Sequence, residues 1–330
     1  MLSKSPLPYA ADRQLPAATL RGIQRLSNDA GILSLCALDH RDALRLLIDP
    51  VHPDTVSNES VVAYKRELCA VLAPHASAVL LDPASGAEHA VVADALPHDV
   101  GLVVSAEDDC DADEDGSRVS ELLVRWSAAD VRRLGADGAS LVAYYHPGHS
   151  ESATWQLREV RQFVERCREG ALPSLVQAFT YRLDPESPES FARRRPELVI
   201  ETARQVTALG VDLLATEFPG DGRSTQDDGR LRDACLELDA ESRAPWVLCG
   251  AGATFDEFAQ QLRIACEAGA AGFLSGRVVW EEAFAIADTG ERRRWLRTVA
   301  ADRLRRLADI AGTHGRPWSA GRTMPWRTTP

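Results

Sequence analysis

The sequence predicts a (β/α)₈ barrel, in which eight parallel strands alternate with helices around a single core. The chain has 330 residues, of which 45% are hydrophobic, so it is long enough to bury a large core. Eight short apolar runs recur along it, and their nearly continuous hydrophobicity is typical of parallel strands covered on both faces. The segments between the runs show the 3.6-residue periodicity of amphipathic helices. Repeated strand–helix alternation favours a closed barrel over an open sheet.

The apolar runs define the expected strands, which are rich in Val, Leu and aromatic residues. They cover residues 32–39, 77–83, 100–107, 139–147, 174–181, 211–219, 246–252 and 271–277. Because no linker, internal repeat or low-complexity tract divides them, we expect one barrel domain over residues 19–312. The N-terminal tail would then be residues 1–18, and the C-terminal tail residues 313–330.

The intervening segments carry helix start and stop signals. The segment "TFDEFAQQLRIACEAG" begins with a Thr cap and two acids and ends at Gly269, while "PELVIETARQVTALG" begins with Pro196 and ends at Gly210. A further segment, "ESVVAYKRELCAVLA", has clear helical periodicity. In addition, "ATLRGIQRLSNDAG" predicts an extra helix before the first strand, and "RRRWLRTVAADRLRRLADIAG" predicts a long closing helix.

Composition excludes several classes of function. A net charge of −12 argues against nucleic acid or an anionic membrane surface as the main partner. No run of 18 apolar residues is present, and the N-terminus lacks the apolar core of a secretory signal. The seven cysteines, an odd number without a C-x-x-C pair, are typical of reduced thiols. We therefore expect a cytoplasmic protein without a membrane or nucleic-acid partner.

In barrels of this kind the functional site is built at the carboxyl ends of the strands. The residues expected there are Asp39, His40, Arg41, Asp82, Glu107, Tyr145, His146, Gln177, Thr180, Tyr181, Glu217, Gly250, Ala251, Gly252, Gly276 and Arg277.

Four of these residues are candidate proton carriers. Asp39 and His40 follow an apolar strand directly, where ionisable groups cost desolvation unless they pair or bind something. His40 titrates near neutral pH and could serve as acid or base, and His146 and Glu217 complete the catalytic set. The alternatives are a salt-bridged cluster of Asp39 with Arg41, and a solvated loop histidine at position 146.

The last two strand ends predict an anion site. Gly250, Ala251 and Gly252 precede one helix, and Gly276 and Arg277 precede the next, so backbone N–H groups and a guanidinium could cradle a phosphate. A tight strand-to-helix turn is the alternative. Polar groups that could bind the rest of a sugar are Arg41, Tyr145, Gln177, Thr180 and Tyr181.

We expect no cofactor and no metal. Nothing in the spacing of Asp39, His40, His146 and Glu217 enforces a metal site. The acidic run at residues 109–117 lacks the glycine and glutamate of an EF-hand and is interpreted as a solvated loop.

Several motifs, in order and from about residue 20 to 300, carry a resemblance to a known family. They include "GILSLCALDHRDALRLL", "YKRELCAVLAPHASAVLLDPASG", "LVQAFTYR", "LGVDLLATEFP", "CGAGATFDEF" and "EAGAAGFLSGRVVW". The chain resembles bacterial tagatose-1,6-bisphosphate aldolases and, more distantly, sulfofructose-phosphate aldolases. The resemblance implies the barrel fold, a phosphorylated ketose as ancestral ligand, the phosphate near Gly252 and Arg277, and a homo-oligomer such as a dimer.

The same resemblance implies a class I aldol cleavage, in which a lysine forms a Schiff base with the substrate carbonyl. That lysine corresponds to Ala215 in this sequence, and a second pocket lysine corresponds to Ser140. An acidic residue corresponds to Gln177, and another to His146.

The chain offers few replacements for the missing lysine. Its lysines are Lys4, in the N-terminal tail, and Lys65, which we interpret as a solvated charge on the outside of the barrel. Arginine cannot form an imine, so an imine mechanism is not expected.

Three hypotheses remain open. The protein is an enzyme that uses acid/base chemistry on a sugar phosphate, as an aldolase-type lyase, isomerase or dehydratase. Alternatively, it is a catalytically silent barrel that binds a sugar phosphate or a protein partner. In the third hypothesis, Lys65 is the imine lysine of a rearranged pocket.

Overall fold

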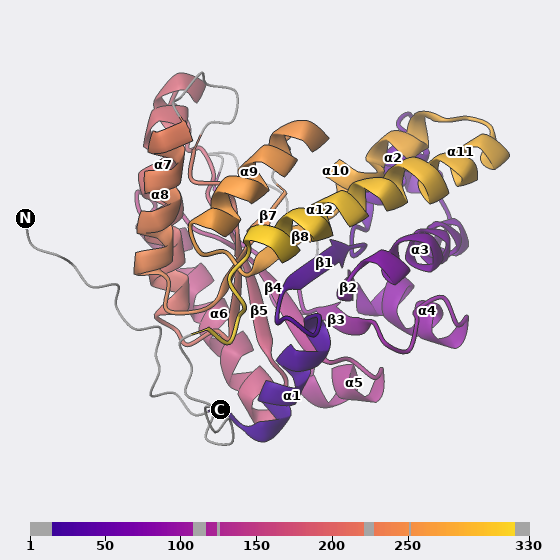
Figure 1. The fold of residues 1–330 in the computed structure, drawn as a ribbon, viewed down its shortest axis with the longest axis horizontal. Coiled ribbons are helices and arrows are strands. Elements are labelled where there is room, and N and C mark those ends of the chain that lie inside the picture. Colours follow the sequence, from indigo (N-terminus) through magenta and orange to yellow (C-terminus); the bar gives the residue numbers. More distant parts are fainter. Residues whose placement is uncertain (1–14, 108–116, 124–125, 221–227, 251, 321–330) are drawn as a thin grey trace, which may run out of the picture.

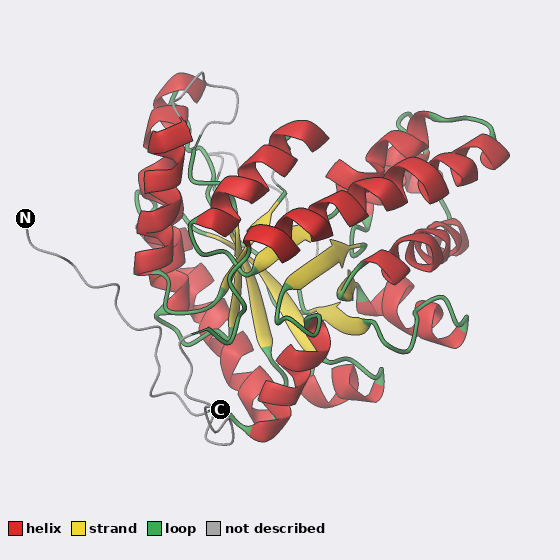
Figure 2. Cartoon of the chain, in the orientation of Figure 1, coloured by secondary structure: helices red, strands yellow, loops and turns green. Residues whose placement is uncertain are grey.

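The computed structural model describes residues 15–107, 117–123, 126–220, 228–250 and 252–320. Eight parallel strands form a closed barrel in the order β1 to β8, with helices around the outside (Figures 1 and 2). The strands are β1 (Leu33–Ala37), β2 (Ala78–Leu81), β3 (Gly101–Ser105), β4 (Gly138–Tyr144), β5 (Ser174–Phe179), β6 (Leu213–Thr216), β7 (Trp246–Cys249) and β8 (Gly272–Ser275). The predicted (β/α)₈ barrel is therefore confirmed.

The helices alternate with the strands and cover the barrel. They are α1 (Ala17–Leu26), α2 (Asp42–Ile48), α3 (Asn58–Leu72), α4 (Glu88–Val92), α5 (Ala128–Arg133), α6 (Ser150–Glu169), α7 (Pro188–Thr207), α8 (Asp228–Glu241), α9 (Phe255–Glu267), α10 (Arg277–Trp280), α11 (Thr289–Trp295) and α12 (Ala301–His314). Short 3₁₀ segments lie at Pro53–Thr55, Ala73–His75 and Glu281–Ala285, and π turns at Pro83–Ala87 and Leu296–Ala300. Among the described helices, none is long and apolar enough to cross a membrane.

The predicted extra helices are confirmed. Helix α1 precedes β1, and α11 and α12, joined by a π turn, form the long closing helix. The described strands are shorter than the apolar runs, because each run also includes the residues that turn into the following loop. Helix α2, which was not predicted, follows β1, and α10 follows the neighbouring strand β8. A helix was expected after Gly276 and Arg277, and α10 begins at Arg277 itself.

Two hydrophobic layers hold the barrel together. One lies between the strands and the outer helices and includes Phe163, Phe258 and Trp246. The other fills the barrel interior, where Ala215 and Leu213 of β6 pack with inward side chains from other strands. Leu20, Ile23 and Leu26 of α1 join this inner layer, so α1 closes the end of the barrel opposite the carboxyl ends of the strands.

The seam between β1 and β8 requires a glycine. Gly272 pairs with Leu33 and has a φ of +143°, and a Cβ built on it would lie 1.9 Å from the Leu33 carbonyl oxygen. A side chain there would push the two strands apart, so this glycine lets the last strand close the barrel on the first.

Candidate functional site

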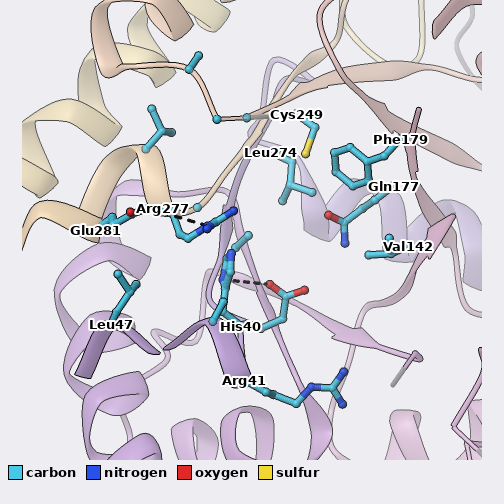
Figure 3. Close-up of a pocket in the computed structure, with 18 of the residues that line it drawn as sticks. His40, Arg41, Leu47, Val142, Gln177, Phe179, Cys249, Leu274, Arg277 and Glu281 are labelled. Carbon is cyan, nitrogen blue, oxygen red and sulfur yellow. Dashed lines mark ion pairs between the residues drawn. The ribbon is translucent and has the colours of Figure 1, made fainter. Parts of the chain in front are cut away.

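A cavity of about 1170 Å³ opens at the carboxyl ends of the strands. Of the predicted site residues, it is lined by Asp39, His40, Arg41, Glu107, Gln177, Thr180, Glu217, Gly250, Gly252, Gly276 and Arg277. These residues come from β1, β3 and β5–β8, so the closed barrel brings together groups that are far apart in the sequence (Figure 3). Ala251 lies outside the described residues.

Four of the described residues that were predicted do not line the cavity: Tyr145, His146, Tyr181 and Asp82, the last of which pairs with Lys65. The tyrosine on the wall is Tyr144, because side chains alternate along β4 and Tyr145 faces the other way. Tyr181 instead shares a hydrogen bond of 2.8 Å with the Ser152 hydroxyl, and His146 packs its ring 5.6 Å from the Tyr181 ring. The Nδ1 of His146 accepts a hydrogen bond from the Gly148 N–H at 3.0 Å, so this buried histidine is not a solvated loop residue either.

Asp39 and His40 stand side by side on the cavity wall. The Nδ1 of His40 lies 3.6 Å from the Asp39 Oδ1, is buried, and has no hydrogen-bond partner. Burial and the positive charges of Arg277 and Lys65 lower the pKa of His40 to about 3, so it is neutral at pH 7. Burial raises the pKa of Asp39 to about 6, with Lys65 acting in the opposite direction, so this carboxyl group is mostly ionised at pH 7.

Glu107 is a second carboxyl group whose pKa is raised. Burial, and next the charge of Asp39, raise the pKa of Glu107 to about 8, so it is mostly protonated at pH 7. Its Oε2 accepts hydrogen bonds from the N–H groups of Val142 at 3.2 Å and Ala106 at 3.3 Å. Arg41 donates to the Glu107 carbonyl oxygen at 3.0 Å. The cavity thus holds two carboxyl groups in different protonation states.

Glu217, by contrast, already accepts hydrogen bonds from other side chains and from the backbone. Its Oε1 accepts from the Thr180 N–H at 2.6 Å and the Thr180 hydroxyl at 3.0 Å. Its Oε2 pairs with the Arg195 guanidinium of α7 at 2.6 Å. These contacts tie the ends of β5 and β6 to α7, which gives Glu217 a role in shaping the cavity wall.

Lys65 is not the solvated surface charge that we expected. It is 1% exposed and pairs with the Oδ1 of Asp82, which is itself fully buried. Its Nζ also lies 3.5 Å from the Asp39 carbonyl oxygen. Burial lowers the pKa of Lys65, with Asp82 acting in the opposite direction. Neither Lys65 nor Asp82 lines the cavity, so the pair supports the Asp39 strand end from behind.

The positions that the resemblance assigns to lysines and an acid lie deep in the barrel. Ala215 is fully buried in the inner layer and is the register neighbour of Gln177 on β5. The Gln177 side chain lines the cavity and donates from Nε2 to the Ser140 hydroxyl at 3.1 Å. An amide–hydroxyl pair therefore occupies this part of the barrel.

The predicted anion site lies where β7 and β8 end. Gly252 has a φ of +74°, and nothing lies within 4 Å of a Cβ built on it. Thr254 caps α9 with a capping box completed by Glu257. The Arg277 side chain is half exposed, and its Nε lies 4.0 Å from Glu281. Figure 3 shows this guanidinium beside the His40 ring. Gly276 makes room for that ring, because a Cβ built on it would lie 2.9 Å from the His40 Cε1.

Comparison with known proteins gives a family and full-length relatives. Residues 34–282 match the family model described as DeoC/LacD family aldolase. The tagatose 1,6-diphosphate aldolase of Staphylococcus epidermidis is 27% identical over 318 residues, covering 90% of this chain and 96% of that protein. The corresponding protein of Staphylococcus haemolyticus is 27% identical over 323 residues, covering 91% and 98%.

Solved structures share the fold. A Schiff-base-forming fructose-1,6-bisphosphate aldolase superposes with a TM-score of 0.59 at 19% identity, covering 88% of this chain and 98% of that one. Fructose-bisphosphate aldolase from Plasmodium falciparum superposes with a TM-score of 0.67 at 14% identity, covering 92% and 98%. At these identities the likeness concerns the barrel architecture alone.

Proposed function

This chain belongs to the DeoC/LacD aldolase family, and from that premise we propose that it acts on a phosphorylated ketose or similar sugar phosphate by acid/base chemistry without an imine. The reaction would be an aldol-type cleavage, an isomerisation or a dehydration. Isomerisation and dehydration begin with loss of a proton from the carbon next to the carbonyl group, whereas aldol cleavage begins with loss of the hydroxyl proton on the second carbon from the carbonyl and ends with protonation of the carbon next to it. The observation that carries the proposal is the presence of Asp39 and Glu107 on one cavity wall, with pKa values displaced to about 6 and about 8.

The absence of an available lysine supports chemistry without an imine. Ala215 has no amine, and Lys65 is engaged by Asp82 away from the cavity wall. Lys4 lies outside the described residues. The hypothesis that Lys65 forms the imine therefore has no support in the geometry, because its amine would have to leave a buried ion pair to reach a ligand.

The two carboxyl groups suit opposite roles at pH 7. Ionised Asp39 can take a proton from the carbon next to the carbonyl in an isomerisation or dehydration. In an aldol cleavage it would take the hydroxyl proton and return it to the enolate carbon once the C–C bond has broken, while protonated Glu107 donates to the carbonyl oxygen. Neutral His40, with its unpartnered Nδ1, is placed beside Asp39 to donate or accept a hydrogen bond from the substrate. In this proposal Glu217 shapes the site, and His146 takes no part because it lies off the wall.

The phosphate would bind at Gly252 and Arg277, which we call the anion corner. Gly252 leaves room for a ligand, and the start of α9 offers backbone N–H donors. The half-exposed guanidinium of Arg277 adds positive charge at the same edge of the cavity. This assignment is consistent with the phosphorylated substrates that the names of the relatives state.

A catalytically silent barrel is the second candidate. The observation in its favour is that Ala215, Gln177 and Ser140 present no ionisable group in the deepest part of the site. The two candidates differ in one measurable property, since only an enzyme introduces a solvent proton at the carbon next to the carbonyl, in the substrate or in its product.

We expect wild-type protein incubated in D₂O with ketose phosphates to incorporate deuterium next to the carbonyl, as measured by NMR, and Asp39→Asn to abolish the incorporation. Borohydride treatment should leave the intact mass unchanged, and an adduct on any lysine would contradict the mechanism.

Thermal stabilisation by sugar phosphates should be lost in Arg277→Ala and kept in Arg133→Ala, which removes an arginine that is 74% exposed elsewhere. Binding without deuterium exchange for any ketose phosphate would favour the silent barrel.

A further inference from the structure

One side of the cavity presents apolar side chains where a polyhydroxylated ligand would need polar partners. Val142, Phe179, Cys249 and Leu274 line it, and we call these four residues the cavity floor. Figure 3 shows them gathered on the side of the cavity away from Glu281, around the Gln177 amide. Cys249 and Leu274 belong to the inner hydrophobic layer of the barrel, and Phe179 packs against that layer.

Few polar groups on the floor could partner sugar hydroxyls. The polar side chains beside the floor already bond within the protein: Gln177 Nε2 donates to Ser140, the Ser120 hydroxyl donates to the Val142 carbonyl oxygen, and Glu107 Oε2 accepts from the Val142 N–H. A hydroxyl buried without a partner costs about 1–3 kcal/mol of binding free energy, whereas an apolar group gains from the same burial. The floor therefore favours a ligand whose inner end carries few hydroxyls.

An aromatic pair extends the apolar surface toward the cavity mouth. Tyr144 and Phe179 are register neighbours on β4 and β5, with ring centroids 6.0 Å apart and planes inclined by 34°. Both rings line the cavity, and the Arg118 guanidinium covers the Tyr144 ring at 5.8 Å. Two neighbouring rings of this kind offer a surface on which a planar or apolar group can pack.

The charges on the described wall also disfavour a second phosphate. Its arginines are Arg41, which donates to the main-chain carbonyl oxygen of Glu107, and Arg277 at the anion corner. Its carboxyl groups are Asp39, Asp42, Glu107, Glu217, Glu281 and Glu282. Glu107 is mostly protonated and Glu217 is paired with Arg195, but ionised Asp39 lies near enough to act on Cys249. None of the four floor residues is a cation, so a second phosphate at the floor would meet no positive partner there.

We propose that the ligand of this cavity carries a single phosphate, bound at the anion corner, and an apolar or aromatic group at its other end, bound by the cavity floor and Tyr144. The proposal rests on the proposed function for the position of the phosphate and adds the class of the rest of the molecule. A singly phosphorylated carbonyl compound with a deoxygenated or aryl-bearing end fits, and a ketose bisphosphate does not.

The test is calorimetric titration of the full chain with inorganic phosphate, phenyl phosphate and tagatose 1,6-bisphosphate. Phenyl phosphate should bind at least about tenfold more tightly than inorganic phosphate, because the ring becomes buried on the floor. Tagatose 1,6-bisphosphate should bind less tightly than phenyl phosphate. Phe179→Ala should remove most of the tenfold preference, while Trp155→Ala, which removes an aromatic side chain 43% exposed on α6, should keep it.

The outcomes separate this inference from the proposed function. Tighter binding of the bisphosphate, or equal binding of phenyl and inorganic phosphate, overturns the inference and leaves the phosphate site intact. Failure of all three compounds to bind overturns both. Loss of affinity for all three in Arg277→Ala supports the anion corner independently of the floor. If circular dichroism shows that Phe179→Ala is unfolded, Tyr144→Ser replaces it, with the same expected loss of preference.

Discussion

At the scale of single residues, the Lys65–Asp82 pair places two opposite charges in the protein interior behind the cavity wall. Both side chains are almost completely buried, and Asp82 also accepts hydrogen bonds from the N–H group of Ser85 at 2.7 Å and its hydroxyl at 3.0 Å. Removing the cation would leave a buried carboxylate without its charge partner. We expect Lys65→Met to lower the free energy of unfolding by about 3–5 kcal/mol, measured by urea denaturation.

A neighbouring residue of the same helix provides the control. Arg66 is exposed, so Arg66→Met should change the free energy of unfolding by less than about 0.5 kcal/mol. Adding Asp82→Asn to Lys65→Met removes the unpaired charge and should recover part of the loss. A loss in Lys65→Met no larger than that of Arg66→Met would show that the pair is not a buried electrostatic support.

The position of Lys65 could have been predicted from its helix. Val61, Lys65, Leu68 and Leu72 follow the i, i+4, i+7, i+11 spacing of one helical face, and all four are buried. A lysine in phase with that apolar face needs an internal partner, but the partner, Asp82, lies on another element. The helical periodicity was therefore enough to predict that Lys65 is buried, whereas its pairing with Asp82 depends on the closure of the barrel.

At the scale of elements, the seam between β1 and β8 decides whether the barrel closes. Gly272→Ala places a Cβ 1.9 Å from the Leu33 carbonyl oxygen and imposes a side chain at a φ of +143°. We expect a loss of about 3 kcal/mol or more in the free energy of unfolding, because either the strands separate or the backbone strains. Chemical denaturation followed by circular dichroism measures it.

Gly312→Ala is the control for Gly272→Ala, because it makes the same change at a glycine away from the seam. Gly312 lies within α12, is exposed, and has nothing within 4 Å of a built Cβ. Alanine in a helix interior is more favourable than glycine by about 0.5–1 kcal/mol, so this variant should be slightly stabilised. Equal effects of the two substitutions would contradict a special role for the seam.

The strands were predictable from sequence because burial on both faces leaves a continuous apolar run. A continuous apolar run does not indicate which of its residues face the barrel interior. For this reason Tyr145 was predicted for the cavity wall, where the structure has Tyr144. Asp39, Gln177 and Arg277 were found because the ends of parallel strands meet at one edge. The contacts of Glu217 with Thr180 and Arg195 depend on packing between elements and were not predictable.

At the scale of the whole molecule, the buried titratable groups of the site act on stability in opposite directions. The lowered pKa of His40, about 3, means that its contribution to stability is lost as the pH falls below about 6.5. Asp39 and Glu107 have raised pKa values, so their contributions are present at low pH and are lost as the pH rises through about 6 and about 8. Between pH 6.5 and 8, Glu107 therefore dominates among these three groups.

In that window the folded protein keeps a proton on Glu107 that the unfolded chain has released. The free energy of unfolding should then fall with rising pH by up to about 1.4 kcal/mol per unit. Glu107→Gln keeps an acceptor for the Val142 and Ala106 N–H groups but cannot titrate, so its free energy of unfolding should not show this fall across the window. Urea denaturation at pH 6.5, 7.25 and 8 measures both slopes. Parallel slopes in the two proteins would mean that Glu107 is already ionised at pH 6.5, and the acid that the proposed mechanism assigns to it would have to come from another group.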